Sequence, residues 1–399
     1  MLQYHFLVKV NRCSQRADPL IFRSAFKCNM RRVLVARGGA LSPFSGLGGS
    51  HQRFVSLLKS GDITGYSLAD ILEYPVAGNS LARAYRRWSS HPKRVARAAG
   101  KGQADILHIT DQEQAHLVPK NCPIPVVVFV HDMFHLAPTI VDSGKEMVEV
   151  GDHNPSRLRR YDMKKLRTGL SRANLFVCNS PSTAEIISNI FSDIPAISVP
   201  YCIDLELYDP HKNLRPKPDW VSQEKMNLLI VGSEESRKRL DFAIEAVALL
   251  PDEIRSKVII HKIGAESSLT SRKQLEDLAV VCEVELNWLG RMEQEDLYAA
   301  YQHTDGLLFP SCAEGFGLPA VEALAAGSWA FIADFPAHNM HLPEGCCLPK
   351  YDRQAWADAI EKRFHERREI NEESLQLAQR YSNESFTTSM AKAWNGLFE

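Results

Sequence analysis

Residues 306–327 read GLLFPSCAEGFGLPAVEALAAG, and this stretch does most to decide the fold. A short apolar run ends at Phe309, a loop with two glycines follows, and Pro319 stands where the first turn of a helix favours proline. The stretch therefore predicts a buried strand, a tight loop and a helix in succession. Because ligands of open parallel sheets bind beyond the carboxyl ends of the strands, the loop is also a candidate binding site.

The same alternation of short apolar runs and amphipathic segments continues along the chain from Arg31 onward. The apolar runs do not alternate with polar residues, which predicts parallel strands that are buried on both faces and covered by helices. Two such series in tandem predict an α/β protein with two Rossmann-like domains that face each other across a cleft. The predicted strands are 33–36, 106–109, 126–130, 175–178 and 197–199 in the first half, and 228–231, 258–263, 284–289, 306–309 and 329–333 in the second.

The length of 399 residues suggests two or three domains. Residues 209–225 contain three prolines and few apolar residues, which is typical of a linker. We therefore expect an N-terminal domain over 30–208 and a C-terminal domain over 226–399, whose last helix packs back on the N-terminal domain. Residues 1–29 form a basic leader without the apolar segment of a secretory signal. Because Met30 directly precedes a predicted strand, we favour a functional start at Met30, or a disordered tail, over a targeting segment.

Composition excludes several classes of protein. Hydrophobic residues make up 45% and charged residues 24%, unlike a disordered, collagenous or fibrous chain. No apolar run approaches the roughly 20 residues of a membrane-spanning helix. Nine cysteines without a Cys-x-x-Cys spacing fit neither a zinc framework nor a secreted disulfide scaffold, so we expect the reducing cytoplasm.

The net charge of −1 hides an asymmetry between the two halves. Residues 1–205 hold 26 Lys+Arg against 16 Asp+Glu, whereas residues 206–399 hold 21 against 32. Much of the positive charge falls in 83–101, where Tyr85 and Trp88 are interleaved with basic residues, and in 157–172. A solvated face is the simplest interpretation; the alternatives are an anionic acceptor and peripheral contact with an anionic membrane on its inner face. No motif for reading nucleic acid accompanies the charge.

Two carboxylates and two cations stand out at predicted strand ends. Glu314 lies in the 310–317 loop, and we expect Glu322 in the first helical turn, so both point at the same cleft, where carboxylates accept hydrogen bonds from vicinal sugar hydroxyls. The alternative is that Glu322 only compensates the dipole of the helix from its first turn. Arg237 and Lys238 follow the strand at 228–231 and are expected to open a helix facing that cleft, unless they are simply solvated.

Other candidates follow strands of the first half. His131 ends the strand at 126–130, where a histidine bonded to the backbone is the simplest interpretation. Asp111 and Asp132 also follow strands. Gly46-x-Gly48-x-x-His51 falls short of a dinucleotide fingerprint because its third position is not glycine.

Together these residues resemble glycosyltransferase family 4. The string Glu-Gly-Phe-Gly-Leu-Pro from Glu314, with Glu322 eight residues later, looks like the Glu-x7-Glu signature of that family. Segments 130–132, 179–183, 200–204, 231–241 and 289–291 resemble further parts of the family, so the likeness covers about 30–399. It implies the two-domain GT-B fold and a retaining, metal-independent transfer of a sugar from a nucleoside-diphosphate sugar to an acceptor in glycan, polysaccharide or glycolipid synthesis.

The resemblance also implies roles for individual residues. Glu314, Lys238, Arg237 and His131 would be catalytic, and Asp111 and Asp132 would lie on the acceptor side. The donor would be bound by Gly48, Gly49, Gly232, Gly290, Arg291, Gly315, Phe316, Gly317, Leu318 and Glu322, with Gly48 and Gly49 in a flexible loop. Many family members have arginine where this chain has Ser233, so Arg237 would supply the second cation. A nucleotide-sugar epimerase, a non-catalytic nucleotide-sugar-binding protein and a Rossmann dehydrogenase are the alternatives.

Overall fold

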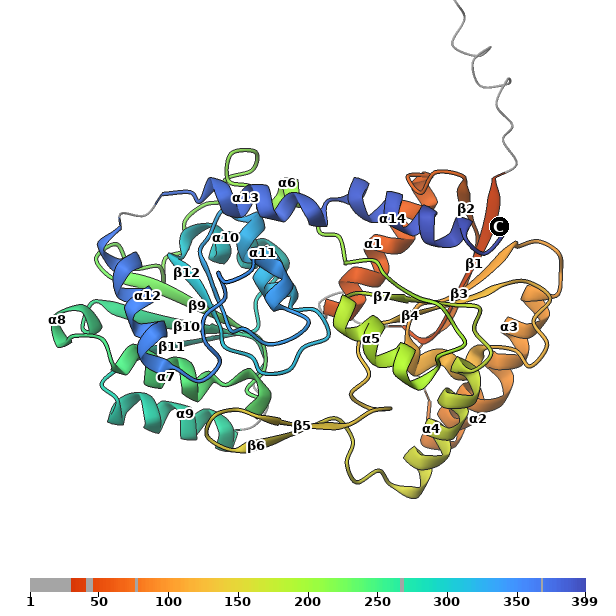
Figure 1. Cartoon of the computed structure of the whole chain (residues 1–399), viewed down its shortest axis with the longest axis horizontal. Helices are drawn as coiled ribbons and strands as arrows, with labels where there is room; N and C mark the ends of the chain where they lie inside the picture. The colour runs from red at the N-terminus through yellow and green to blue at the C-terminus, as the bar shows by residue number, and fades with distance from the viewer. Residues whose placement is uncertain (1–29, 41–45, 76–77, 266–268, 367–368) are drawn as a thin grey trace, which may run out of the picture.

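Two parallel β-sheets, one in each half of the chain, form the framework of the protein (Figure 1). The computed structural model describes residues 30–40, 46–75, 78–265, 269–366 and 369–399; the predicted leader over 1–29 lies outside the described residues. The strand order is β2-β1-β3-β4-β7-β8 in the first sheet and β11-β10-β9-β12-β13 in the second. This arrangement confirms the α/β fold class predicted from the sequence.

Five of the predicted strands have the bounds expected, and the other five differ by one to three residues at an end. The strands of the first sheet are β1 (Arg31–Gly39), β2 (Tyr66–Tyr74), β3 (Ile106–Ile109), β4 (Val126–Val130), β7 (Leu175–Cys178) and β8 (Ala196–Ser198). Those of the second are β9 (Met226–Val231), β10 (Val258–Ile263), β11 (Glu285–Gly290), β12 (Gly306–Phe309) and β13 (Ala330–Ile332). A separate antiparallel hairpin consists of β5 (Thr139–Asp142) and β6 (Met147–Val150).

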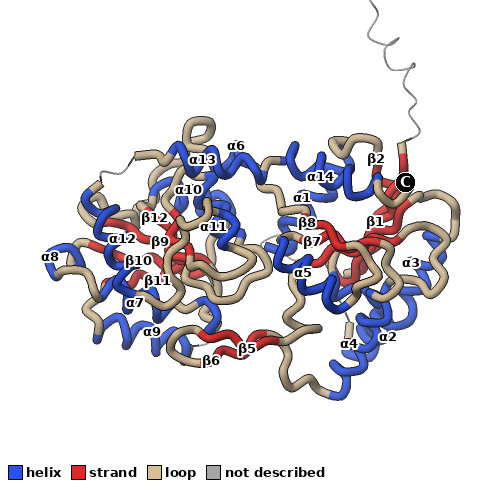
Figure 2. Tube along the Cα trace, viewed as in Figure 1, coloured by secondary structure: helices blue, strands red, loops and turns tan. Residues whose placement is uncertain are grey.

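Helices surround the strands of each sheet (Figure 2). In the N-terminal half they are α1 (Gly46–Ser60), α2 (Ser80–Tyr85), α3 (His91–Ala99), α4 (Arg157–Leu170) and α5 (Pro181–Ile190). Then follow α6 (Leu205–Tyr208), α7 (Leu240–Ala248), α8 (Asp252–Arg255), α9 (Leu269–Val281), α10 (Gln294–His303), α11 (Leu318–Ala325), α12 (Arg353–His365), α13 (Glu372–Ala378) and α14 (Asn383–Asn395).

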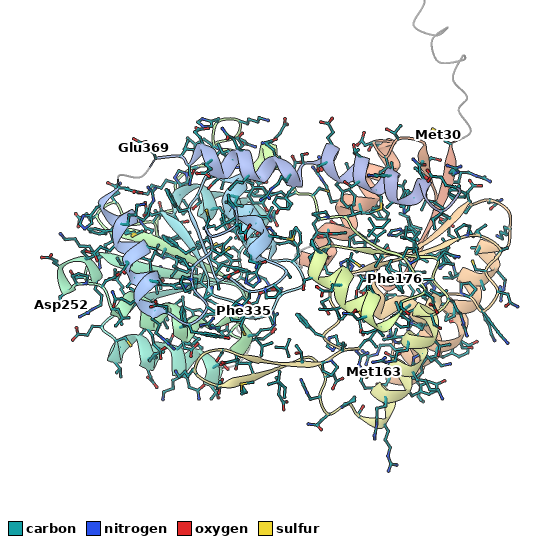
Figure 3. The ribbon with its side chains drawn as sticks, in the orientation of Figure 1. Met30, Met163, Phe176, Asp252, Phe335 and Glu369 are labelled. Carbon is teal, nitrogen blue, oxygen red and sulfur yellow. The ribbon has the colours of Figure 1, made fainter. Side chains whose placement is uncertain are left out.

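Burial on both faces explains why the strands read as unbroken apolar runs. In β1, Val33 and Val35 belong to one buried cluster, with residues of α1 and α14, while Leu34 and Ala36 belong to another, with residues of α3 and α4. Phe176 of β7 is likewise fully buried, in the interior of the N-terminal half (Figure 3). Placing a polar side chain on either face of such a strand would remove it from water, which costs free energy. The alternation of apolar and polar residues that marks a strand with one exposed face is therefore absent.

The C-terminal helix α14 packs on the N-terminal sheet, although it follows the C-terminal sheet in sequence. The ring of Trp394 meets the rings of Tyr66 and Phe54 edge-on, with centroids 4.8 and 6.2 Å apart. At the other end of α14, the Arg53 guanidinium donates a hydrogen bond to the Asn383 side chain at 2.9 Å. The cluster that contains these rings continues into residues of β9, β12 and α11, so one apolar core runs through both halves.

Three strands, β2, β5 and β6, were not predicted, and neither was the packing of the connecting segment on the C-terminal half. The edge strand β2 contains acidic and exposed residues, and the β5–β6 hairpin is exposed on one side, so neither reads as an apolar run. The segment 209–225 connects the two sheets, but it is packed on the C-terminal half. Its Arg215 backbone N–H donates to the Gln302 side chain at 2.8 Å, and the Trp220 ring lies 4.6 Å from that of His261. The domain boundaries around it stay our prediction.

The described part of the chain contains no helix that combines the length and the apolar character needed to cross a membrane.

Candidate active site

The loops that follow β4 and β12 meet where the carboxyl edges of the two sheets face each other. The two loops approach closely at Gly315, because an added Cβ there would lie 2.1 Å from the carbonyl oxygen of His131. The Thr183 hydroxyl donates a hydrogen bond to the Gly315 carbonyl at 3.4 Å. Contact between the two halves, rather than the turn alone, therefore requires glycine at position 315.

The loop between β12 and α11 has the strand–loop–helix form predicted from its glycines and proline. Gly317 has a φ of 94°, in the left-handed region, and directly precedes α11, whose first turn contains Pro319. Between the two glycines, Phe316 is buried, with its ring 5.0 Å from that of Tyr201 in the segment leaving the first sheet.

Glu314 is the centre of a charged cluster at this meeting point. Its carboxylate pairs with the Lys238 ammonium and, at 3.2 Å, with the Arg237 guanidinium. Ser311 Oγ lies 2.7 Å from Glu314 Oε1. Only 10, 13 and 20% of the Glu314, Lys238 and Arg237 side chains are exposed. Burial by itself raises the pKa of Glu314, but the two cations outweigh it and lower that pKa to about 2. The carboxylate is therefore ionised at neutral pH.

The prediction that Arg237 and Lys238 open a helix is wrong. They lie in a single 3₁₀ turn, Ser236–Lys238, followed by Arg239 with a left-handed φ of 54°, and α7 begins only at Leu240. The turn is held against the β12 loop, since the Arg237 carbonyl accepts hydrogen bonds from Cys312 N at 2.8 Å and Ser311 Oγ at 3.1 Å. The two cations are thus positioned by their pairing with Glu314 and by hydrogen bonds between the 3₁₀ turn and the β12 loop.

A buried ion pair lies behind this turn. Lys262 of β10 pairs with Glu234, and neither side chain is exposed to solvent. The Lys262 ammonium also lies 4.7 Å from the centre of the Trp288 ring. Because a charge removed from water must be compensated, this pair fixes the residues just ahead of Arg237.

Glu322 lies one turn further into α11 than predicted, so the expectation of a first-turn, dipole-compensating acid is wrong. Its carboxylate accepts hydrogen bonds from the hydroxyls of Tyr208 at 2.9 Å and Tyr301 at 2.7 Å. Burial raises the pKa of Glu322, and these two hydrogen bonds partly offset that effect. Glu322 is thus held by two tyrosines rather than by the cations that pair with Glu314.

His131 is bonded within its own half of the protein. One ring nitrogen, Nε2, lies 2.7 Å from the Thr110 carbonyl, and the other, Nδ1, contacts the Tyr201 hydroxyl. Since a carbonyl only accepts, Nε2 carries the proton and Nδ1 accepts from the tyrosine. Burial lowers the pKa of His131 to about 4, so the ring is neutral at pH 7. A hydrogen bond from this ring to a sugar would require one of the two bonds to be given up.

The two aspartates predicted on the acceptor side have different surroundings. Asp111 is buried and accepts a hydrogen bond from Glu113 N at 2.7 Å, which caps the 3₁₀ helix Gln112–Leu117. Asp132 is partly exposed, and its Cβ would lie 3.1 Å from a Cβ at Gly315. Asp132 is therefore the one of the two that lies at the contact between the halves.

Gly48 and Gly49 lie in the first turns of α1, so their assignment to a flexible loop is wrong. Residues 41–45, which precede the helix, lie outside the described residues. An added Cβ at Gly46 would be 3.3 Å from Leu318 Cδ1, so the N-termini of α1 and α11 approach each other across the two halves. Free N–H groups at two helix N-termini favour an anion between them.

The remaining donor candidates lie along the carboxyl edge of the second sheet. Gly232 follows β9 with a φ of 139°, and an added Cβ there would lie 3.7 Å from Lys238 Cε. Gly290 ends β11, two strands from β9, and the exposed Arg291 follows it. The Gly290 carbonyl accepts a hydrogen bond from Gly264 N at 2.8 Å. The structure thus brings Gly232 to the charged cluster and leaves Gly290 and Arg291 at the far end of the edge.

Sequence reasoning did not single out the residues that orient the two glutamates and the histidine. Tyr201 and Tyr208 lie 70 and 114 residues from the groups they contact, whereas Tyr301 lies on the preceding helix, 21 residues from Glu322. No local spacing marks any of the three. Ser311 lay within the deciding stretch, but its hydroxyl was not assigned a role. Among the described residues, no group of three or more His, Cys, Asp or Glu is arranged to hold a metal ion. Metal independence stays a prediction.

Two families match adjoining parts of the chain. Residues 32–207 match Glycosyltransferase Family 4, and residues 212–383 match Glycosyl transferases group 1.

Curated relatives match more limited segments. A D-inositol 3-phosphate glycosyltransferase of Geodermatophilus obscurus is 28% identical over 206 residues, which cover 49% of this chain and 45% of the relative. The serotype-specific mannosyltransferase WbdA of Escherichia coli is 26% identical over 65% of this chain and 33% of its own length. The chain spans about half the length of the first curated relatives it matches.

Solved structures match almost the whole fold. HepE of Anabaena, in complex with UDP and glucose, has a TM-score of 0.66 at 14% identity over 92% of this chain and 100% of that chain. WaaG, a glycosyltransferase involved in lipopolysaccharide biosynthesis, has a TM-score of 0.62 at 16% identity over 90% and 98% of the two chains. At such identities the likeness concerns the fold.

The low pKa of Glu314 predicts a pH-dependent contribution to stability. The pKa of about 2 in the folded protein lies below the ordinary 4.5, so the ionised carboxylate stabilises the fold above about pH 4.5 and loses this effect as the pH falls toward 2. The shift corresponds to about 3 kcal/mol. We expect Glu314→Gln to lower the free energy of unfolding at pH 7, and the difference from wild type to shrink between about pH 4.5 and pH 3, measured by chemical denaturation.

Glu235→Gln is the matched control, because Glu235 also pairs with Arg237 but is 53% exposed. Its effect should be small. A Glu314→Gln difference that stays constant between pH 7 and about pH 3 would contradict the prediction.

Proposed function

Since the chain belongs to glycosyltransferase family 4, with a C-terminal half of the glycosyl transferases group 1, we propose that it transfers a hexosyl unit from a nucleoside-diphosphate sugar to an acceptor hydroxyl with retention of configuration. The observation that carries the proposal is the Glu314–Lys238–Arg237 cluster at the meeting point of the two sheets. We place the reaction in the cytoplasm, in the synthesis of a glycan, polysaccharide or glycolipid.

The donor diphosphate would replace Glu314 as the partner of Lys238 and Arg237. Transfer leaves negative charge on the departing phosphate, and fixed cations in a site with little water stabilise such charge without reorganising. The approaching N-termini of α1 and α11 support the same position for the phosphates. Once released from the cations, the Glu314 carboxylate is free to accept hydrogen bonds from hydroxyls of the transferred sugar.

The remaining donor residues follow from the same placement. The backbone of Gly315, Phe316 and Gly317 would lie against the sugar, and Glu322 would accept from the ribose hydroxyls, oriented by Tyr208 and Tyr301. Gly290 and Arg291, at the end of the edge, would lie beside the base. His131 would border the transferred sugar, with its ring fixed by Thr110 and Tyr201.

Retention would result from attack on the face from which the phosphate leaves. The acceptor hydroxyl forms the new bond to the anomeric carbon as the bond to phosphate breaks, and its proton passes to an oxygen of the departing phosphate. Asp132 supports an acceptor position beside Gly315, whereas Asp111 is engaged in capping a helix. In this scheme no protein carboxylate becomes bonded to the sugar.

A thermal-shift panel of nucleoside diphosphates and their sugars tests the proposal, because a ligand that binds only the folded state raises the melting temperature. HepE was solved with UDP and glucose, so UDP and UDP-glucose are the first ligands to test, followed by the other bases. We expect one nucleotide and its sugar to raise the melting temperature. An assay for net transfer to an added acceptor then separates a transferase from an epimerase or a binding protein. No shift with any member of the panel would refute the proposal.

Removal of Lys238 should abolish most of the activity. We expect Lys238→Ala to lower turnover by about two orders of magnitude or more, the scale of a lost preorganised charge. Steady-state transfer kinetics measure this, with circular dichroism to confirm folding. Lys225→Ala is a control, since Lys225 pairs with Glu285 at the other end of β9. Near-wild-type turnover of Lys238→Ala would remove this residue from the mechanism.

Donor binding and transfer should persist in excess chelator, because Lys238 and Arg237 take the place that a divalent cation occupies in metal-dependent transfer. The measurement is the transfer rate before and after addition of EDTA, and again after Mg²⁺ is restored. Complete loss that is reversed by the metal would show that a metal site had been missed.

The basic surface of the N-terminal half supports an anionic partner, but its composition needs correction. Arg87 and Arg159 do not project freely, since both pair with the buried Asp162, at 2.7 and 3.0 Å. Trp88 also donates to Asp162, at 2.7 Å, so it is not available for a headgroup boundary, whereas Tyr85 is 64% exposed. The exposed charge that remains on α3 consists of Lys93, Arg94 and Arg97.

We therefore propose a lipid-linked or otherwise anionic acceptor, with weak and salt-sensitive contact to the inner face of a membrane. Each basic residue contributes about 1 kcal/mol at most near an anionic surface. We expect the protein to sediment with anionic but not neutral liposomes at low salt, and the triple variant Lys93→Glu/Arg94→Glu/Arg97→Glu to sediment much less.

The control for this variant is Lys257→Glu/Lys273→Glu/Lys362→Glu, which changes the charge equally at exposed positions of the other half. The membrane proposal fails if wild type ignores anionic liposomes at low salt, or if the two triple variants behave alike.

A further inference from the structure

The β5–β6 hairpin is an arm of the N-terminal half that lies on the C-terminal half. It belongs to the segment between β4 and α4, and it extends along the bottom of the molecule toward the second sheet (Figure 1). Its register pairs Thr139 with Val150 and Asp142 with Met147. α14 connects the two halves on the opposite side of the picture, so the halves are joined on both sides.

One face of the hairpin packs against the loop that carries Glu314. Val148 and Val150 are 6 and 3% exposed and form a buried cluster with Ala313. On the other face, Ile140 and Met147 are 52 and 63% exposed. Since Ala313 directly precedes Glu314, the hairpin covers the backbone that positions this carboxylate.

The root of the hairpin reaches the cationic turn. Phe134 packs against the same cluster, and its ring centre lies 6.0 Å from the Arg237 guanidinium. Arg237 in turn donates a hydrogen bond to the Ala313 carbonyl at 2.8 Å. The hairpin therefore holds both the Glu314 loop and one of the two cations that pair with it.

The tip of the hairpin is held by the surface of the C-terminal half. The Lys145 ammonium lies 3.3 Å from Asp241 and 3.1 Å from Glu245, both on α7. The Tyr351 hydroxyl donates to the Asp142 carbonyl at 3.4 Å. Gly144 packs so closely on the Tyr351 ring that an added Cβ would lie 2.7 Å from Cδ1.

These contacts are much weaker than those on the opposite side of the cleft. Lys145 is 52% exposed, and ion pairs of that kind contribute about 1 kcal/mol or less. The apolar contact consists of three buried residues with Phe134 and Val141 packed beside them, and Val141 also touches the core of the C-terminal half. It is small compared with the core through α1, α14 and α11, which is continuous between the halves. The hairpin can therefore leave the C-terminal half while the other connection stays formed.

The proposed donor site is largely covered in this structure. The two cations that would bind the diphosphate, Lys238 and Arg237, are only 13 and 20% exposed, and the loops of the two halves are in contact at Gly315. We infer that the β5–β6 hairpin is a releasable latch of the donor site: seated, it fixes Arg237 and the Glu314 loop, and donor exchange requires its release. This inference rests on the proposed function.

A disulfide between positions 144 and 351 tests the need for release. The Cβ of residue 144 would lie 3.4 Å from Tyr351 Cβ, close to the roughly 3.8 Å of a disulfide. In a Cys346→Ser background, which removes an exposed neighbouring thiol, Gly144→Cys/Tyr351→Cys is oxidised with diamide. We expect UDP, or whichever nucleotide the wild type binds, to associate at least about tenfold more slowly, and dithiothreitol to restore the rate. Each single variant under diamide is the control.

Loss of seating is tested by Val148→Ser/Val150→Ser, with Ile140→Ser/Met147→Ser on the exposed face of the same hairpin as the matched control. We expect the first variant to raise KM for the donor at least about tenfold while the control stays near wild type. The variant Val148→Ile/Val150→Ile, which keeps the apolar contact, should have the wild-type KM. Small-angle scattering should show a larger radius of gyration for the first variant alone.

The two proposals fail in different ways. If the wild type binds no nucleotide, the proposed function fails and the latch falls with it. If the nucleotide binds but the oxidised double-cysteine protein binds it as fast as the reduced one, or if both serine variants keep the wild-type KM and radius, the latch is refuted and the proposed function stands.

Discussion

The interaction on which the site depends is the pairing of one carboxylate, Glu314, with two cations, Lys238 and Arg237, in a place that water barely reaches. Burial alone would protonate the carboxyl, but the cations hold its pKa at about 2. The pairing ties the loop after β12 to the turn after β9. It also places two positive charges at the meeting point of the two sheets, where we propose that the donor diphosphate binds.

Small residues and hydrogen bonds make this arrangement possible. Glycine at 315 lets the loops of the two sheets touch, and the Arg237 carbonyl ties the cationic turn to the β12 loop through Ser311 and Cys312. Two further residues of the site, Glu322 and His131, are oriented by hydrogen bonds with tyrosine hydroxyls from other segments of the chain. The proposed transfer chemistry is thus carried by loops, while the sheets supply rigid ends from which those loops start.

The two connections between the halves differ in strength, and this difference has a functional consequence. On the side of α14, aromatic side chains such as Trp394 and Phe54 belong to one apolar core that runs into the second sheet. On the side of the β5–β6 hairpin, a few valines and an exposed lysine form the contact. The release that we infer for the hairpin takes place on this weaker side, next to Arg237.

The sequence by itself determined the two parallel sheets, because burial on both faces leaves apolar runs that can be read locally, and it determined the β12–α11 loop, because glycine and proline restrict the backbone wherever they stand. It also marked Glu314, Lys238 and Arg237 as charges at strand ends. Only the tertiary structure decided that Arg237 lies in a 3₁₀ turn, that Glu322 is held by two tyrosines, that Arg87 pairs with Asp162, and that the hairpin lies on the other half. Each of these depends on segments far apart in the chain, whose contacts are fixed by packing and by the need to pair buried polar groups, and neither requirement leaves a local pattern.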